Sequence, residues 1–119
     1  MRKLILIAAA LAFGSLAANA DPLQDGARYF QRNDYQRALA SWRPMAIQGN
    51  PVAQNNLGIM YLDGKGVPQN TAEAVRYLSL SAAAGSSLGQ NNLGGLYRDG
   101  KGVPRDFARA AQWFSASAA

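Results

Sequence analysis

Residues 54–68 read QNNLGIMYLDGKGVP, and residues 90–104, which begin 36 positions later, read QNNLGGLYRDGKGVP. When residues 52–83 are aligned with residues 88–119, 18 of the 32 positions are identical. A long internal period is typical of repeat proteins, in which each unit buries its apolar face only against its neighbours. The duplication therefore predicts an array of stacked units, and it favours a binding surface over an enclosed catalytic pocket.

Each unit has the pattern of two helices joined by a turn. Asn50 followed by Pro51 is typical of a helix start, because the amide side chain caps free N–H groups and proline is tolerated at the first helical position. The glycines and the proline of segment 64–68 end this helix. Asn70 and Glu73 then resemble the cap and the partner of a capping box, which starts the second helix.

A third, degenerate copy precedes the two clear ones. Asp34 lies 36 residues before Asn70, whereas Tyr29 lies only 32 residues before Tyr61. The difference predicts that the turn of this copy is four residues shorter. The helices expected from this copy are 22–32 and 34–48.

The sequence as a whole predicts an all-α fold, an α/α superhelical solenoid of about three helix-turn-helix repeats at residues 22–49, 50–85 and 86–119. Gly58 and Gly94 occupy the same mid-helix position in two repeats, where glycine costs up to about 1 kcal/mol relative to alanine. We expect a neighbouring helix to cross at this position and to leave no space for a side chain.

The first twenty residues are typical of a secretory signal peptide. Arg2 and Lys3 precede the apolar run 4–17, which is followed by an A-x-A cleavage site that ends at Ala20. The run is shorter than the about 20 apolar residues that a membrane-spanning helix needs. We therefore expect cleavage after Ala20, a mature domain of residues 21–119 without stable membrane insertion, and a periplasmic or secreted location.

Composition narrows the classes of function. The chain has 12 basic and 7 acidic residues, scattered rather than clustered, which argues against nucleic-acid binding. It has no His and no Cys, which argues against His-based triads, most zinc sites and thiol chemistry. The two Gly-Lys-Gly turns lack the remainder of a phosphate-binding loop. We predict no catalytic residue, no cofactor, no metal and no enzymatic activity.

The repeated residues closely resemble the Sel-one-like repeat (SLR), a relative of the tetratricopeptide repeat. The family pattern is Ala-x-x-x-Leu-Gly-x-x-Tyr, then Gly-x-Gly-Val-Pro, then Ala-x-x-Trp, then Ala-Ala-x-x-Gly. In this chain Tyr77 stands where the pattern has Trp, and Gly89 replaces the first Ala of the last repeat. The matching residues of the first clear copy are Ala53, Leu57, Gly58, Tyr61, Gly64, Gly66, Val67, Pro68, Ala74, Ala82, Ala83 and Gly85.

The resemblance implies a solenoid that binds other proteins, and bacterial members of the family are often exported. It implies an exported interaction module, an adaptor or scaffold of the bacterial cell envelope, whose partner is another protein. An immunity or inhibitor protein that neutralises a toxic envelope-acting effector enzyme is the alternative. A cell-wall-active enzyme is the least favoured interpretation, because the chain lacks His and Cys.

In this repeat class the first helix of each pair lines the concave face. On each of these helices, some residues lie on the side opposite the positions that the repeat pattern uses for packing. We predict that these residues form the partner-binding surface. The alternative is a groove that is filled only with solvent. The predicted partner-binding residues are Phe30, Asn55, Ile59, Leu62, Asn91 and Arg98.

Two further expectations concern the aromatic residues and the last helix. Phe30, Trp42 and Phe114 fit the repeat less tightly and are expected to be exposed, whereas the other aromatic residues, Phe107 among them, are expected in the core. The last helix ends at Ala119 without a polar capping helix. Self-association through this helix, docking on a partner and fraying are the three alternatives.

Overall fold

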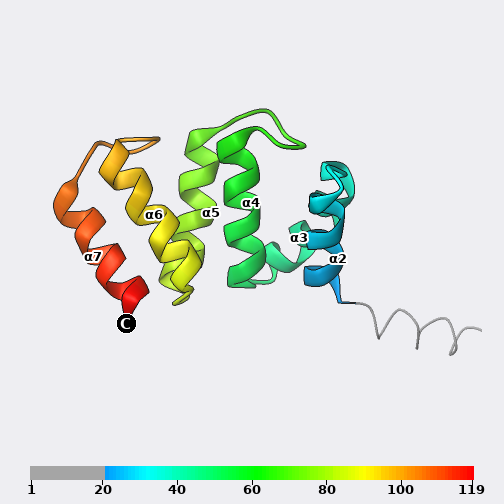
Figure 1. The fold of residues 1–119 in the computed structure, drawn as a ribbon, viewed down its shortest axis with the longest axis horizontal. Helices are drawn as coiled ribbons and strands as arrows, with labels where there is room; N and C mark the ends of the chain where they lie inside the picture. The colour runs from blue at the N-terminus through cyan, green and yellow to red at the C-terminus, as the bar shows by residue number, and fades with distance from the viewer. Residues whose placement is uncertain (1–20) are drawn as a thin grey trace, which may run out of the picture.

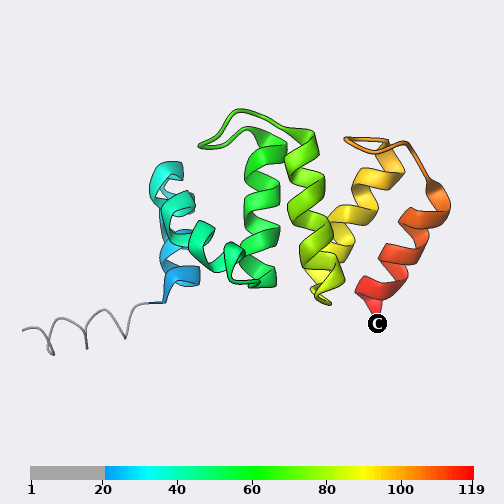
Figure 2. The same cartoon turned by 180° about the vertical axis from the view of Figure 1, so that it is seen from behind.

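The computed structural model describes residues 21–119, so the predicted signal peptide lies outside the described part of the chain. Residues 21–119 form six helices and no strand, arranged as three successive helical pairs (Figures 1 and 2). This confirms the predicted all-α solenoid. The helices are α2 (Pro22–Gln31), α3 (Tyr35–Ile47), α4 (Pro51–Asp63), α5 (Thr71–Ala83), α6 (Ser87–Asp99) and α7 (Phe107–Ala118). None of these helices is both long and apolar enough to cross a membrane.

The helix starts are capped as predicted, with one correction. Asn70 Oδ1 accepts a hydrogen bond from the backbone N–H of Glu73 at 3.1 Å, which satisfies one free donor at the start of α5. The reciprocal half of the capping box is wrong. The backbone N–H of Asn70 donates to the carbonyl of Tyr61 at 2.9 Å, and the Glu73 carboxylate pairs with Arg76 at 3.0 Å.

The same hydrogen bonds recur 36 residues apart between neighbouring pairs. Gln54 Nε2 donates to the carbonyl of Ala46 at 3.2 Å, and Gln90 Nε2 donates to the carbonyl of Ala82 at 3.2 Å. These bonds join the second helix of one pair to the first helix of the next pair. Serine hydroxyls of the second helices bond in turn to carbonyls of the first helices, in the pairs Ser81–Pro51 at 2.7 Å and Ser117–Ser87 at 2.9 Å.

The degenerate first pair follows the predicted register. The backbone N–H of Asp34 donates to the carbonyl of Tyr29 at 2.8 Å, as Asn70 does to Tyr61 in the next pair. Asn33 closes the short turn with φ at 60°, and it is the only non-glycine residue with positive φ within residues 21–119. Asparagine adopts this left-handed conformation more readily than most residues. The turn that the sequence shortens by four residues is therefore made by a residue suited to it.

The core consists of two clusters of buried side chains that meet on α5. The first cluster extends from α3 to Tyr77 of α5 and contains Leu57 and Met60, which are fully buried. The second joins Leu78 of α5 to Leu93 of α6. Each helix packs on the next one in sequence, and α4 also contacts α6. The molecule is therefore held together by nearest-neighbour contacts, as expected for a repeat array.

The mid-helix glycines lie where side chains of a neighbouring helix approach closely. A Cβ atom on Gly58 would lie 2.7 Å from Cγ of Leu78, and a Cβ atom on Gly94 would lie 2.8 Å from Cε1 of Phe114. Both distances are too short for a real Cβ contact. The prediction of a close crossing is confirmed, and the approaching groups are the side chains of the second helix of the same pair.

Two expectations about aromatic residues are wrong. Trp42 is 4% exposed, because its ring inserts against Gly26 of α2, where no side chain competes for the space. Its indole N–H donates to the carbonyl of Leu23 at 3.2 Å. Phe107 is 62% exposed at the start of α7, where the guanidinium of Arg105 lies 5.0 Å from the ring centroid.

Candidate functional site

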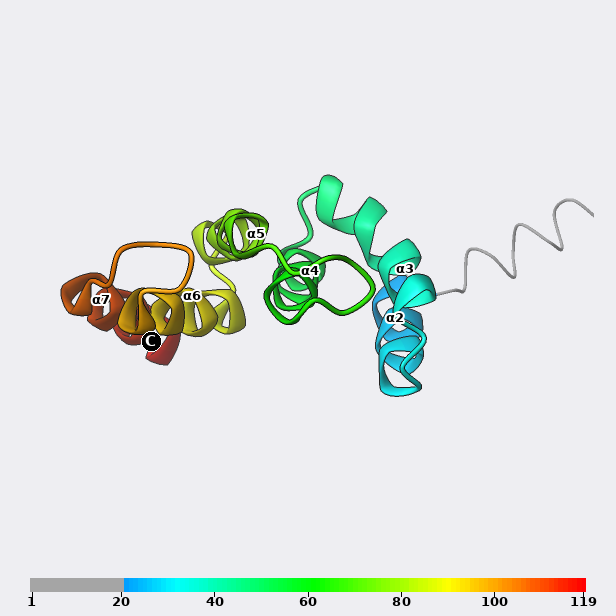
Figure 3. The same cartoon turned by 90° about the horizontal axis from the view of Figure 1, so that it is seen from above.

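The first helices of the three pairs form one side of the solenoid. Seen from above, α2, α4 and α6 follow one another along one side, and α3 and α5 lie along the other (Figure 3). We call the side of α2, α4 and α6 the first-helix face. Each of the predicted partner-binding residues belongs to one of these three helices.

A hollow of about 240 Å³ opens on the first-helix face between α2 and α4, with α3 behind it. Two predicted residues, Phe30 and Ile59, line it and are half-buried. The Phe30 ring is held edge-on against Tyr35, with centroids 5.2 Å apart, and Lys65 Nζ lies 5.1 Å from its centroid. The expectation that Phe30 is exposed is therefore only partly met, since one face of the ring is packed against the protein.

A second hollow, of about 250 Å³, lies between α4 and α6, with Phe114 of α7 at its edge. Three predicted residues, Leu62, Asn91 and Arg98, line it. Arg98 donates from Nε and Nη2 to the two carboxylate oxygens of Asp99, at 2.9 Å and 3.2 Å, and its guanidinium lies 5.9 Å from the half-buried Phe114 ring. The hollow is therefore apolar at its base and charged at its rim.

Asn55 lies beneath this surface and not on it. It is 5% exposed, its Oδ1 accepts a hydrogen bond from Asn92 Nδ2 at 2.8 Å, and its Nδ2 donates to Asn56 Oδ1 at 3.4 Å. The prediction of Asn55 as a contact residue is corrected, because its amide links α4 to α6. The neighbouring amides Asn56 and Asn92 are half-buried and line the hollows instead.

An ion pair, Arg98 with Asp99, lies at the rim of the second hollow. The hydrogen bond from Arg98 lowers the pKa of the Asp99 carboxyl, and the same bond raises the pKa of Arg98. Both shifts keep the pair ionised at neutral pH. No group of three or more His, Cys, Asp and Glu side chains within residues 21–119 is placed to hold a metal ion. The arrangement of apolar hollows, amides and an ion pair suits recognition of a polypeptide surface.

Comparisons with known proteins agree with this geometry. The sequence model of the Sel1 repeat matches residues 51–86 and 87–119. The chain is 37% identical to a protective antigen of uropathogenic Escherichia coli that displays an SLR fold, with a TM-score of 0.76 over 82% of this chain and 22% of that chain. It is 31% identical to a Sel1 repeat protein from Oxalobacter formigenes, with a TM-score of 0.77 over 84% of this chain and 40% of that chain.

The chain thus spans less than half the length of either solved structure. None of the curated proteins compared with the chain matches it. The two solved structures carry the SLR architecture, in agreement with the repeat pattern of residues 51–119.

Proposed function

We propose, because this chain belongs to the Sel1 repeat family, that it works as a protein–protein interaction module of the bacterial cell envelope. Sel1 repeats generally mediate binding to other proteins, and their fold is typically a scaffold without enzymatic activity. The envelope location is supported by the signal-like sequence of residues 1–20. We assign the binding of the partner to the first-helix face.

One observation carries this assignment: half-buried apolar side chains of α2 and α4 line two hollows that open on the same face. Phe30 and Ile59 line one hollow, and Leu62 lines the other. A partner segment that covers these side chains gains about 25 cal/mol for each Å² of apolar surface removed from water. The amides of Asn56 and Asn92 can at the same time donate to and accept from the backbone of an extended segment.

Site-specific photo-crosslinking in living cells tests the face directly. A photoreactive phenylalanine analogue replaces Ile59 or Leu62 in the full-length chain, signal-like segment included. The control is the same replacement at Ala40, which is exposed on α3, outside the first-helix face. We expect one discrete crosslinked protein from positions 59 and 62 and none from position 40. Equal crosslinking at all three positions would contradict the assignment.

Charge reversal provides a second test of the same face. Arg98→Glu places two like charges beside each other at the rim of the second hollow, because Asp99 is its present partner. We expect the crosslink from position 62 to weaken strongly, while the circular dichroism of the variant is unchanged, since both side chains are more than half exposed. A crosslink of undiminished yield would remove Arg98 from the binding surface.

The export of the protein is tested by a separate measurement. Mass spectrometry of the protein recovered from the periplasm or the medium should give a mature chain that begins at Asp21. A chain that retains Met1 in the cytoplasm would overturn the envelope location and leave the binding face untouched.

A further inference from the structure

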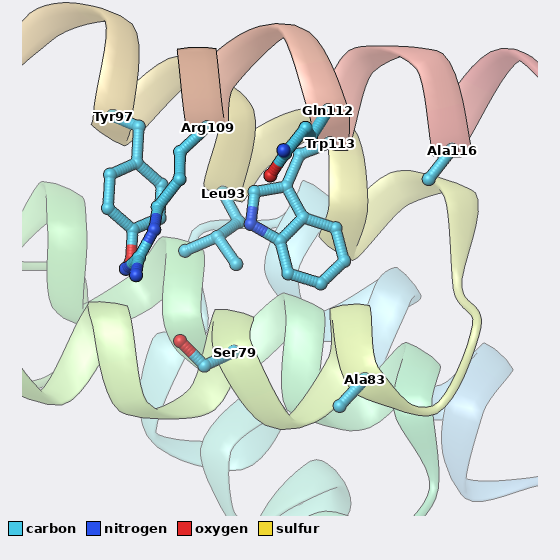
Figure 4. Close-up of a pocket in the computed structure, with 8 residues that line it drawn as sticks. All are labelled: Ser79, Ala83, Leu93, Tyr97, Arg109, Gln112, Trp113 and Ala116. Carbon is cyan, nitrogen blue, oxygen red and sulfur yellow. The ribbon is translucent and has the colours of Figure 1, made fainter. Parts of the chain in front are cut away.

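We propose that a hollow between α5 and α7, apart from the first-helix face, is a second binding site that takes an apolar side chain next to a carboxylate from a protein partner. The hollow has a volume of about 450 Å³, within the range of about 300–1,000 Å³ that is typical of binding pockets. It is formed by α5, α6 and α7 (Figure 4). None of the predicted partner-binding residues lines it.

The base of the hollow is apolar, and the side chains on its two walls differ in size. Leu93 of α6, which is 2% exposed, forms the base together with the half-buried indole of Trp113 from α7. The facing wall on α5 carries only the small side chains of Ser79 and Ala83 (Figure 4). Because this wall has no large side chain, one face of the Trp113 ring borders open space.

The hollow is a property of these residues and not of the repeat geometry. At the positions 36 residues earlier, between α3 and α5, Arg43 stands in place of Ser79 and Ile47 in place of Ala83. Arg43 Nη2 approaches the hydroxyl of Tyr61 at 3.5 Å, and the Tyr61 ring stacks on Tyr77 with centroids 5.8 Å apart. The earlier junction therefore carries long side chains where the later one carries short ones.

The charge at the rim favours an acidic occupant. Arg109 Nη1 donates to the hydroxyl of Tyr97 at 3.1 Å, and the guanidinium lies 5.5 Å from the Tyr97 ring centroid. Within residues 21–119 no carboxylate oxygen lies within 4.0 Å of this guanidinium, whereas Arg98 and Arg76 are each ion-paired. A carboxylate of a partner would find an arginine held in place by a neutral phenol and still able to form a charge-assisted hydrogen bond.

Two further donors face the same space. The indole N–H of Trp113 and the hydroxyl of Ser79 point into the hollow from opposite walls (Figure 4). A site with a half-exposed Trp, an adjacent Tyr and an available Arg has the composition of an interface hot spot, in which an apolar anchor is buried and flanked by charged contacts. For that reason we assign the occupant to a protein partner, and not to a free small molecule.

The two tryptophans of the chain provide a matched reporter and control. The sequence contains only Trp42 and Trp113, so the indole N–H region of a ¹⁵N–¹H spectrum has two signals. Trp113 lines the proposed site, whereas the Trp42 N–H is bonded to Leu23 and lies near the first-helix face. The probe is a blocked tetrapeptide, Gly-Phe-Asp-Gly, titrated into the 21–119 chain.

We expect a saturable shift of the Trp113 signal and a constant Trp42 signal. Gly-Phe-Asn-Gly should bind about ten-fold more weakly, the loss expected for one charge-assisted hydrogen bond, and Gly-Ala-Asp-Gly should lose the apolar anchor and also bind more weakly. The double variant Ser79→Arg/Ala83→Ile, which installs the side chains of the earlier repeat, should abolish the shift. Amide signals of α6 and α7 that remain dispersed in the ¹⁵N–¹H spectrum of this variant would confirm that the half of the solenoid around the hollow is folded.

Arg109→Gln serves as a second variant, because its exposed side chain can be changed with little risk to the fold. It should weaken Gly-Phe-Asp-Gly and leave Gly-Phe-Asn-Gly unaffected. The proposal is overturned if no peptide shifts Trp113 saturably, if the double variant binds as well as the natural chain, or if the Trp42 signal moves instead. Phenylacetate binding as tightly as the acidic peptide would reassign the site to small aromatic acids.

Discussion

At the scale of single residues, the missing side chain of Gly58 lets Leu78 fill the space between α4 and α5. We predict that Gly58→Ala destabilises the protein, because its Cβ atom would lie 2.7 Å from Leu78 Cγ. Overpacking costs about 1–3 kcal/mol, from which the higher helix propensity of alanine recovers up to about 1 kcal/mol. Denaturant unfolding measures the difference.

Gly95→Ala is the matched control for this substitution. Gly95 also lies inside a helix, but the nearest atom that a Cβ at this position would meet is Arg98 Nη2 at 3.9 Å, an ordinary contact. The control variant should gain stability, by up to about 1 kcal/mol, through helix propensity alone. If both variants shift the unfolding midpoint in the same direction, the close approach of Leu78 is not what excludes a side chain from position 58.

Glu73 gives the stability a small dependence on pH. The hydrogen bond from Arg76, which is the largest cause, lowers the pKa of Glu73 below its ordinary value of 4.5. A lowered folded pKa adds stability that is present above pH 4.5 and is lost as the pH falls through the folded pKa. For this partly exposed pair we expect Glu73→Gln to cost about 0.3–0.5 kcal/mol at pH 7. Unfolding curves at pH 7 and pH 3 should show that cost vanish at the lower pH, and a cost that grows on acidification would be inconsistent with this role of Arg76.

Some contacts of single residues could not be predicted from the sequence. Gly89 departs from the repeat pattern, and a Cβ atom there would collide with Oγ of Ser81, whose hydroxyl is engaged with the carbonyl of Pro51. Trp42 is buried because Gly26 faces it. Both contacts join residues on different helices. The sequence next to either residue does not indicate which residue it will contact.

At the scale of elements, helix boundaries follow from short-range chemistry. Asn50 Oδ1 accepts from the N–H groups of Val52 and Ala53, both at 3.0 Å, at the start of α4. We predict that Asn50→Ala costs about 1 kcal/mol, whereas Asn50→Asp costs little, because aspartate caps equally well. Thermal unfolding of both variants measures this, and an equal loss in both would mean that the amide group itself is needed.

The sequence does not predict how each helix is rotated about its own axis. Adjacent Asn residues occur twice, at 55–56 and 91–92, and successive residues of a helix point about 100° apart. Whether Asn55 or Asn56 faces the proposed binding surface therefore depends on how α4 packs on α6. The sequence specifies that α4 is a helix and where it begins and ends, but a difference of one residue decides which amide is buried.

At the scale of the whole molecule, the division of the core into two clusters leads us to expect that the halves of the solenoid unfold separately. We predict that Leu93→Ala, which removes a buried side chain from the second cluster, costs about 2–5 kcal/mol. Because contacts run between neighbouring helices, amides of α6 and α7 should lose hydrogen-exchange protection first while α3 and α4 retain theirs.

Leu57→Ala is the corresponding substitution in the first cluster. Leu57 is fully buried, so the loss of stability should be similar in size, with protection lost first from α3 and α4. Hydrogen exchange followed by mass spectrometry distinguishes the two patterns. Uniform loss of protection over all helices in both variants would show that residues 21–119 unfold as one cooperative unit.

The architecture was predictable because a repeated sequence with caps and turns constrains both helix number and order. Five of the six predicted contact residues line the two hollows of the first-helix face, and Asn55 does not. Their role in binding remains a prediction. The α5–α7 hollow was missed, although the sequence carries a signal for it: the replacement of Arg43 and Ile47 by Ser79 and Ala83 one period later. This replacement indicates a hollow only when it is known which two helices border the space.

The hydrogen bonds from Gln54 to Ala46 and from Gln90 to Ala82 join successive pairs in the same way. A gene duplication that inserts one more 36-residue unit in frame would create a junction with these bonds already in place. Recombination in whole units would thus lengthen the solenoid with this contact between pairs preserved, and each added unit would enlarge the proposed binding surface.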